Sequence, residues 1–409
     1  MQLARALRKN ALRSGAMLVT LAVVTGVRAD AGEIEAYSTL FYEFGGPLNM
    51  LVITPRADVR VNPHEALTLR AGWEADVVSG ASVAVVDAPG SVDAITSATR
   101  VEDFRNVFSG SMELRSQFAT FRGGYSYGFE NDYRTHSFFL GARTELFERN
   151  TSFDLSYARG FDAVCDLNQP RAQEAVQRRR LDGAEGCFSA DPTRISRDIA
   201  MHTFQGGWTQ AWAPVLVTQV TVTAQYVEGF QSNPYRAVWL GRVAAQEHHP
   251  SERFRYSAGV GARLWIEALH AALQINGRVY RDSWDVRSLT AELAYEQSLG
   301  SDLRLRVRGR YYRQGGAAFF SDDYGLLPRG QYFTGDRELS DMQSFMVGGQ
   351  LAWTLQAGGE GVSLGPFSSF HLVLKGDWIR HDFQAFRYGR VGVPNVDNLV
   401  VTLGLEVGF

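Results

Sequence analysis

Cysteine, long apolar runs and surplus positive charge are all scarce in this chain of 409 residues. Only 2 cysteines occur. After residue 29 no segment approaches the ~18 consecutive apolar residues that a transmembrane helix needs, so any later membrane span has to be formed by β-strands. The formal net charge is -3. This charge argues against nucleic-acid binding, because nucleic acids select basic surfaces.

Recognisable catalytic and cofactor motifs are also missing. The sequence has no glycine-rich phosphate loop and no CxxCH haem attachment site. Its 8 histidines show no metal-ligand spacing, and none has an obvious serine or aspartate partner of the kind that a hydrolase uses. Two similar aspartate-led segments, DVVSGAS at 76–82 and DAITSAT at 93–99, could bind Ca2+, but turn formation explains their composition without a metal. We expect no enzyme, no metal and no cofactor.

The first 29 residues predict a signal peptide. Four basic residues at the N-terminus precede an apolar core at 16–27, and a small-residue cleavage site follows at Ala29. The apolar core is too short to cross a bilayer as a helix. Removing this segment takes away five basic and no acidic residues and leaves a charge of about -8. Residues 30–409 show no linker and no change of character, so we expect one large domain.

The C-terminal segment 398–409 carries the clearest structural pattern. Apolar residues occupy every second position from Leu399 to Phe409, and this period of two predicts a β-strand with one apolar face. A terminal phenylalanine on such a strand resembles the closing strand of bacterial outer-membrane barrels, where it is also the assembly signal. The resemblance implies that the barrel-assembly machinery reads Leu405, Val407 and Phe409, and that the protein lies in the bacterial outer membrane.

Fifteen further segments share this two-faced pattern, so the sequence predicts sixteen strands. An even number suits a single-chain bacterial barrel. In the segment 252–266, for example, Arg255 and Arg263 belong to the polar stripe opposite an apolar one. The predicted strands are 33–44, 50–61, 66–78, 104–117, 119–129, 135–147, 151–160, 196–210, 215–228, 252–266, 270–281, 285–298, 302–313, 341–356, 367–380 and 397–409.

The links between these segments alternate in length. After even-numbered strands the chain turns within a few residues, except at 357–366. After odd-numbered strands the links are mostly long, as at 79–103, 161–195, 229–251, 314–340 and 381–396. This alternation is typical of outer-membrane barrels with short periplasmic turns and long extracellular loops. We therefore expect an all-β fold, a single transmembrane antiparallel β-barrel.

One predicted strand, 302–313, carries arginine at four alternate positions. A basic residue facing lipid at the midplane costs up to ~4 kcal/mol, so this stripe has to point inward. Either the arginines line an electropositive lumen that concentrates anions, or they form a salt-bridge lattice with inward acids such as Glu292 and Glu296. The candidate lumen-lining residues are Arg255, Arg263, Arg278, Glu292, Glu296, Arg304, Arg306, Arg308 and Arg310.

Both cysteines, Cys165 and Cys187, fall in the link predicted at 161–195. An exported chain folds in an oxidising compartment, so we expect the pair to form a disulfide within one extracellular loop. The bond would close about 22 residues and stabilise the fold by roughly 3 kcal/mol in the chain-entropy picture.

Several segments together resemble one family of uncharacterised bacterial outer-membrane β-barrels, classified as a domain of unknown function. The similarity runs from about Tyr37 to Phe409. The resemblance implies the fold, the location and a redox-linked role in the envelope, although no residue of this chain demonstrates that role. Besides the two aspartate-led segments, it rests on SYGFENDY at 126–133, FERNT at 147–151, NPYR at 233–236, RVYRDSWDV at 278–286, RYYRQ at 310–314 and FTGDRELS at 333–340.

The sixteen strands and their polar inner face favour a porin-like passive channel for small polar or anionic solutes. The alternative is a non-conducting barrel that serves as a scaffold for an envelope partner, and an outer-membrane enzyme comes third. How far the long loops fold inward decides between the first two. Expected partners are outer-membrane lipids and the assembly machinery, with any periplasmic partner unidentified and no nucleic acid.

Overall fold

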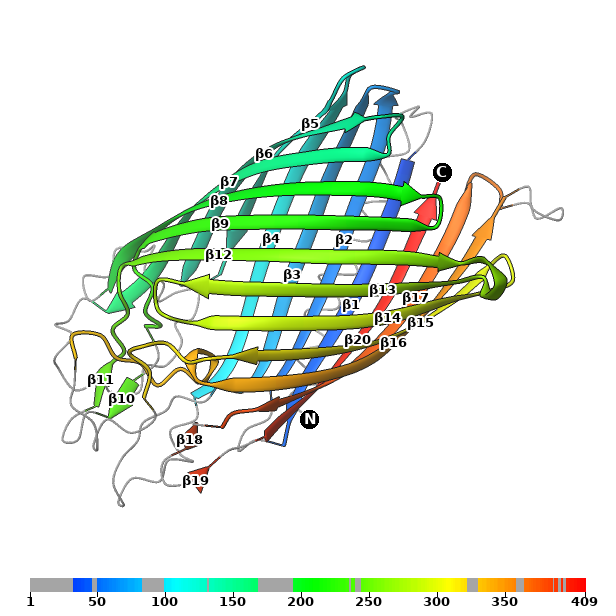
Figure 1. Ribbon diagram of the computed structural model, residues 1–409. Helices are drawn as coiled ribbons and strands as arrows, with labels where there is room; N and C mark the ends of the chain where they lie inside the picture. The colour runs from blue at the N-terminus through cyan, green and yellow to red at the C-terminus, as the bar shows by residue number, and fades with distance from the viewer. Residues whose placement is uncertain are drawn as a thin grey trace.

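The protein is a single closed antiparallel β-barrel (Figure 1). Its strands follow the order β1-β2-β3-β4-β5-β6-β7-β8-β9-β12-β13-β14-β15-β16-β17-β20, and β20 pairs back onto β1. The predicted barrel of sixteen strands is confirmed. The computed structural model describes residues 32–45, 50–82, 99–130, 132–167, 194–234, 237–239, 244–321, 330–357, 364–384, 386–388, 391–392 and 395–409.

The strands of the barrel are β1 (Gly32–Phe44), β2 (Met50–His64), β3 (Leu67–Ser82), β4 (Thr99–Arg115), β5 (Thr120–Phe129), β6 (Tyr133–Leu146), β7 (Thr151–Leu167), β8 (Arg194–Ala213), β9 (Leu216–Gly229), β12 (Glu252–Ile266), β13 (Ala271–Asp282), β14 (Arg287–Leu299), β15 (Leu303–Gln314), β16 (Met342–Gln356), β17 (Ser369–Asp382) and β20 (Asn395–Gly408). The other elements are β10 (Ala237–Trp239), β11 (Ala244–Gln246), β18 (Arg387–Tyr388), β19 (Val391–Gly392) and the 3-10 turns η1 (Glu267–Leu269) and η2 (Arg337–Leu339).

Closure brings the two ends of the barrel sequence together. Gly32 donates a backbone hydrogen bond to Phe409 at 2.9 Å and accepts one back at 3.0 Å. The ring of Phe409 lies over Gly32, where a Cβ would fall 2.3 Å from Cζ of the ring. A closed ladder leaves no strand edge unpaired, which a structure inside a bilayer requires.

The outer face of the barrel is apolar. Large apolar side chains recur at every second position and are openly exposed, such as Val260 at 59%, Val347 at 58% and Leu293 at 53%. Exposed apolar surface on this scale is unfavourable in water and favourable against lipid. A closed barrel with such a face is one of the two structures that can cross a bilayer.

The two rims of the barrel differ in the predicted way. On one rim the chain turns tightly, for example through residues 147–150 between β6 and β7 and through η1 between β12 and β13. The other rim, at the lower left of Figure 1, carries the longer connections with β10, β11, β18 and β19. Among the described residues no helix has the length and apolar character needed for a membrane span.

Several strands extend further than the sequence predicts. β7 continues to Leu167 instead of ending at 160, and β3 continues to Ser82 instead of ending at 78. Main-chain pairing needs no apolar side chains, so the ladder runs on beyond the point where hydrophobic alternation stops. The loops at 79–103 and 161–195 were therefore predicted too long.

This extension changes the setting of the cysteines. Cys165 lies within β7 and is 2% exposed, so its prediction as a loop residue is wrong. Cys187 lies outside the described residues, as does most of the link between β7 and β8. The disulfide stays a prediction.

Candidate functional site: the inner wall and the extracellular cap

The arginines of β15 lie on the inner face of the barrel. Leu305 and Val307 alternate with them and stand on the outer face, 39% and 48% exposed. Successive side chains of a strand point to opposite faces. The inner face of β15 therefore presents Arg304, Arg306, Arg308 and Arg310, the arginine ladder.

Arg308 forms an ion pair with Asp377, two strands away on β17. Its Nε and Nη2 donate to the two carboxylate oxygens at 3.0 and 2.7 Å, the bidentate geometry that suits a guanidinium group. Gly348 of β16 lies between them in register with both. A Cβ at this glycine would fall 1.9 Å from Oδ1 of Asp377, so a side chain here would displace the carboxylate.

The rest of the ladder carries no ion pair among the described residues. Arg306 donates to the amide oxygen of Gln274 at 3.0 Å, which is a neutral partner. Arg304 and Arg310 have no hydrogen-bonding side-chain partner in the described part of the chain. Glu292 faces Arg310 in register but forms no ion pair with it. Three of the four ladder charges are thus not neutralised by a carboxylate.

The neighbouring strands extend this basic wall. Arg255 donates to Gln225 at 2.9 Å, and Arg278 donates to the hydroxyl of Ser257 at 3.2 Å. These partners are again neutral.

Arg263 contacts Glu296 at 3.3 Å, so Glu296 pairs with β12 rather than with the ladder. Of the predicted salt-bridge alternative, the described residues show the pair Arg308–Asp377, but no ion pair between the ladder and Glu292 or Glu296.

Acidic side chains gather on a different part of the inner wall, where β1 meets β20. Glu35 lies opposite Asp58 of β2 and opposite Glu406 of β20, so three carboxylates follow one another across adjacent strands. Glu406 accepts a hydrogen bond from Tyr37 and contacts Nδ1 of His371 at 2.9 Å. The described inner wall therefore carries charges of opposite sign on different strands.

Six segments at the extracellular rim pack into a unit that we call the extracellular cap. Its main apolar core consists of Trp284, Val286, Ala317 and Leu339, all at most 8% exposed, with Phe319 packed against them. A core of its own gives this layer a defined structure over the mouth of the barrel. The cap comprises the residues 230–234, 246–251, 283–286, 315–321, 330–341 and, in the last segment, 383–384 with 386.

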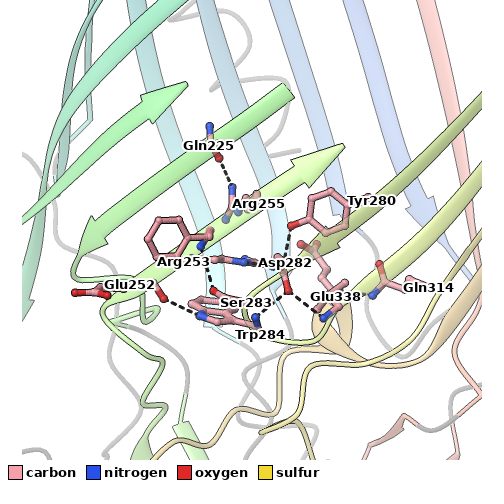
Figure 2. Close-up of polar contacts among 12 residues, drawn as sticks. Gln225, Glu252, Arg253, Arg255, Tyr280, Asp282, Ser283, Trp284, Gln314 and Glu338 are labelled. Atoms are coloured by element: carbon pink, nitrogen blue, oxygen red, sulfur yellow. Dashed lines mark hydrogen bonds and ion pairs between the residues drawn. The ribbon is translucent and has the colours of Figure 1, made fainter. Parts of the chain in front are cut away.

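A buried ion pair anchors the cap to the inner wall (Figure 2). Arg253 of β12 is 9% exposed, and its Nε donates to Asp282 of β13 at 2.8 Å. The other oxygen of Asp282 accepts from the backbone N–H groups of Trp284 and Val286, both at 3.0 Å. The guanidinium carbon of Arg253 lies 3.9 Å from the centroid of the Trp284 ring. One carboxylate thus fixes both the arginine and the turn that carries the core tryptophan.

Two further carboxylates tie the cap together. Glu247 is 1% exposed and accepts from the backbone N–H of Asn233 at 2.7 Å and from the hydroxyl of Thr334 at 2.8 Å. It joins the connection after β9 to the connection after β15. Arg337 of η2 reaches Glu43 at the end of β1 at 2.6 Å. The cap is therefore attached on both sides of the mouth.

Sequence reasoning placed no functional residue in the cap, yet the motifs behind the family resemblance meet there. The segment 278–286 supplies Asp282 and Trp284, and the segment 333–340 supplies Arg337. The segment 233–236 supplies Asn233, whose backbone N–H donates to Glu247. Gln314, at the end of 310–314, donates to the carbonyl oxygens of Glu338 and Ser340, both at 2.8 Å (Figure 2). Segments distant in sequence thus build one structure.

No cluster of His, Cys, Asp or Glu within the described ranges could hold a metal ion. Asp76, from the first aspartate-led segment, accepts a hydrogen bond from Thr54 at 2.7 Å. Asp87 and Asp93, two other residues considered for Ca2+, lie outside the described residues.

Residues 13–364 of the chain match a family described as proteins of unknown function, DUF3570. The chain belongs to this family. The resemblance read from the sequence is thereby confirmed, although the match starts and ends earlier than the predicted span from Tyr37 to Phe409. No curated protein matches the chain.

Solved structures similar to this DUF3570 barrel are outer-membrane barrels. A bacterial polysaccharide outer membrane secretin superposes with a TM-score of 0.50 at 9% identity, over 92% of this chain and 98% of that one. The Pseudomonas aeruginosa protein OccK2 gives 0.43 at 11% identity, over 93% and 98% of the two chains. A BenF-like porin from Pseudomonas fluorescens gives 0.44 at 10% identity, over 93% and 99%. At such identities the likeness concerns the fold alone.

Proposed function

We propose that the protein is an outer-membrane channel that passes small polar solutes and prefers anions. The observation that carries this proposal is the set Arg304, Arg306 and Arg310, which face the lumen without a carboxylate partner among the described residues. A barrel of sixteen strands is wide enough to enclose water. Low-dielectric walls focus the field of such charges into the lumen, where it raises the local concentration of anions.

The acids near β20 support a channel of limited selectivity. Glu35, Asp58 and Glu406 follow one another on the inner wall, three to five strands from β15 in the barrel order. Asp58 pairs with Arg56, and Glu406 contacts His371. Charges of opposite sign on different walls orient a dipolar solute as it passes, so small zwitterionic solutes fit the lumen as well as anions do.

The extracellular cap supports the second candidate, a non-conducting barrel that holds an envelope partner. Its buried pair Arg253–Asp282 and its tie Arg337–Glu43 hold loops across the mouth. A cap that sealed the mouth would leave the ladder in contact with trapped water only. The same electrical measurement separates the two candidates, because a sealed barrel carries no current.

The test is the reversal potential of the refolded barrel in a planar bilayer under a KCl gradient. We expect the wild type to favour Cl⁻ over K⁺. In the double variant Arg304→Gln, Arg310→Gln the permeability ratio should move toward K⁺ by about threefold, as expected for screened charges that each contribute under ~1 kcal/mol. The melting temperature should stay unchanged, since neither side chain has a side-chain partner among the described residues.

The double variant Arg308→Gln, Asp377→Asn is the matched control. It removes the ion pair from the same wall, one positive and one negative charge together, and so leaves the net charge of the lumen unchanged. It should therefore change the permeability ratio little and lower the melting temperature. An unshifted ratio in the variant Arg304→Gln, Arg310→Gln contradicts the channel assignment of the ladder.

Export and assembly belong to the same proposal. Residues 1–29 are removed on export, and Leu405, Val407 and Phe409 present the apolar outer edge of β20 to the assembly machinery. The packing of the Phe409 ring over Gly32 supports a role for the last residue in barrel closure.

A further inference from the structure

Three arginines form a row on the outer face of the barrel, at the extracellular end of adjacent strands. Arg281 of β13 lies directly opposite Arg287 of β14, and Arg313 of β15 lies opposite Leu289, the next outward residue of β14. All three side chains are exposed. Because β13, β14 and β15 are neighbours in the barrel, the row runs along one stretch of the rim (Figure 1).

The row lies at the boundary of the apolar outer face. The next outward residues on β13 and β14 are Val279 and Leu289, which are 54% and 50% exposed. Further along the same face of β15 comes Val307 at 48%. The guanidinium groups are therefore at the level where the hydrocarbon of the outer leaflet ends and its headgroups begin.

Within the residues that the structure describes, the arginines have no protein partner that would explain their position. None of the three forms an ion pair or a side-chain hydrogen bond within the described part of the chain. Like charges directly opposite each other on neighbouring strands destabilise a sheet, so the facing of Arg281 and Arg287 is unfavourable by itself. Asp341, the nearby carboxylate at the start of β16, accepts from the backbone N–H of Gly316 at 2.9 Å. An anion between the two guanidinium groups would convert the repulsion into attraction.

The surface beside the row is hollowed on both sides. A cavity of about 720 Å³ is lined by Arg287, Arg313 and the apolar side chains of Leu289 and Met342, and also by Asp341. A larger cavity of about 1070 Å³ is lined by outer-face apolar side chains such as Leu155 and Val222 and reaches Arg281. An elongated apolar chain next to an anionic group matches this arrangement.

We propose that Arg281, Arg287 and Arg313 bind the phosphate of an anionic lipid in the outer leaflet, whose acyl chains lie in the adjoining cavities. Arginine holds phosphate oxygens through paired N–H donors, which gives such a contact both strength and geometry. Basic clusters at the membrane boundary are the usual recognition sites of anionic headgroups. The site is on the lipid side of the wall and is independent of whether the lumen conducts.

The test compares lipids added to the barrel in zwitterionic detergent micelles. Dioleoyl phosphatidic acid should raise the melting temperature of the wild type, whereas dioleoyl phosphatidylcholine and inorganic phosphate should not. In the triple variant Arg281→Gln, Arg287→Gln, Arg313→Gln the affinity for phosphatidic acid, measured by titration of the melting temperature, should fall roughly 100-fold, since each basic residue near an anionic surface contributes about a fivefold factor.

Two comparisons make the outcome decisive. Arg159→Gln removes a single outward arginine of β7, which lies 4.6 Å from the centroid of the Phe161 ring, and it should keep the wild-type response. Arg287→Gln alone should melt higher than the wild type without added lipid, because it removes the repulsion from Arg281. The proposal is overturned by a triple variant that responds to phosphatidic acid like the wild type, or by inorganic phosphate that stabilises the wild type equally.

Discussion

Arg308 and Asp377 are joined across Gly348 by two hydrogen bonds of 3.0 and 2.7 Å, although two strand spacings separate them. Of the four charges on the ladder, this one is neutralised by the protein itself. In the described part of the chain, the other three face the lumen with neutral partners or none, and this difference makes the ladder testable residue by residue.

Replacing Gly348 by alanine should destabilise the barrel. The new Cβ would fall 1.9 Å from Oδ1 of Asp377 and push the carboxylate away from Arg308. Disturbing a largely desolvated ion pair of this kind should lower the free energy of unfolding by about 2 kcal/mol. Urea-induced unfolding in lipid vesicles measures the change.

Gly376→Ala is the control for this prediction. Gly376 lies on β17 next to Asp377, and a Cβ there would meet nothing within 4 Å. Its unfolding free energy should stay within about 0.5 kcal/mol of the wild type, which is usual for a surface substitution. Equal losses in both glycine variants would show that the space at 348 is unimportant.

Asp282→Asn should loosen the extracellular cap. The substitution leaves Arg253 buried without its counter-charge and weakens the hydrogen bonds that hold the Trp284 turn. Removing one partner of a buried pair destabilises a fold by about 3 to 5 kcal/mol. We expect this loss of stability to make local opening of the cap more frequent. Limited proteolysis should cleave the segment 283–286 at least tenfold faster than in the wild type.

The exposed neighbour Asp285 serves as the comparison. It adopts a left-handed φ of 67°, a conformation that asparagine tolerates, so Asp285→Asn keeps the turn. Cleavage at the wild-type rate is expected in this variant. Rapid cleavage of both variants would assign the effect to the turn in general and not to the ion pair.

Glu43→Gln should increase the current through the barrel. It breaks the ion pair of 2.6 Å that ties Arg337 of the cap to β1, so the cap can swing away from that side of the mouth. We expect single-channel conductance to rise, with more frequent transitions between levels. A current trace identical to that of the wild type would mean that this tie does not restrict the mouth.

Phe409→Ala should slow barrel closure. The ring packs over Gly32 and holds the last residue of the ladder against the first. The folded fraction after refolding into vesicles, read from the heat-modifiable mobility of the barrel in gels, should rise several-fold more slowly. Phe118→Ala, which changes a turn residue that is 83% exposed, should refold like the wild type.

The sequence alone predicts the barrel because every strand has to meet the same requirement, an apolar face toward lipid and a polar face toward the lumen. A wall between lipid and water needs apolar and polar residues in alternation, and this alternation is visible in every strand, as in the segment 252–266 that the structure reproduces as β12. By the same reasoning, the alternation within 302–313 predicts that its four arginines lie on the inner face.

The cap and the outer arginine row could not be predicted in this way. The contact between Arg337 and Glu43 joins residues nearly 300 positions apart, and no periodicity relates them. The salt-bridge alternative named inward acids in general, Asp377 among them, but it did not say which acid Arg308 contacts. A guanidinium group can reach over a glycine to the second strand, and sequence spacing does not reveal this. Cys165 was placed in a loop because hydrophobic alternation ends before main-chain pairing does.

The most direct test of the proposed anion channel is the current through the refolded wild-type barrel in a planar bilayer under a KCl gradient. We expect discrete ohmic openings and a reversal potential that indicates preference for Cl⁻, carried by Arg304, Arg306 and Arg310. A bilayer that stays at its baseline conductance after verified insertion, or a reversal potential that indicates preference for K⁺, would contradict it.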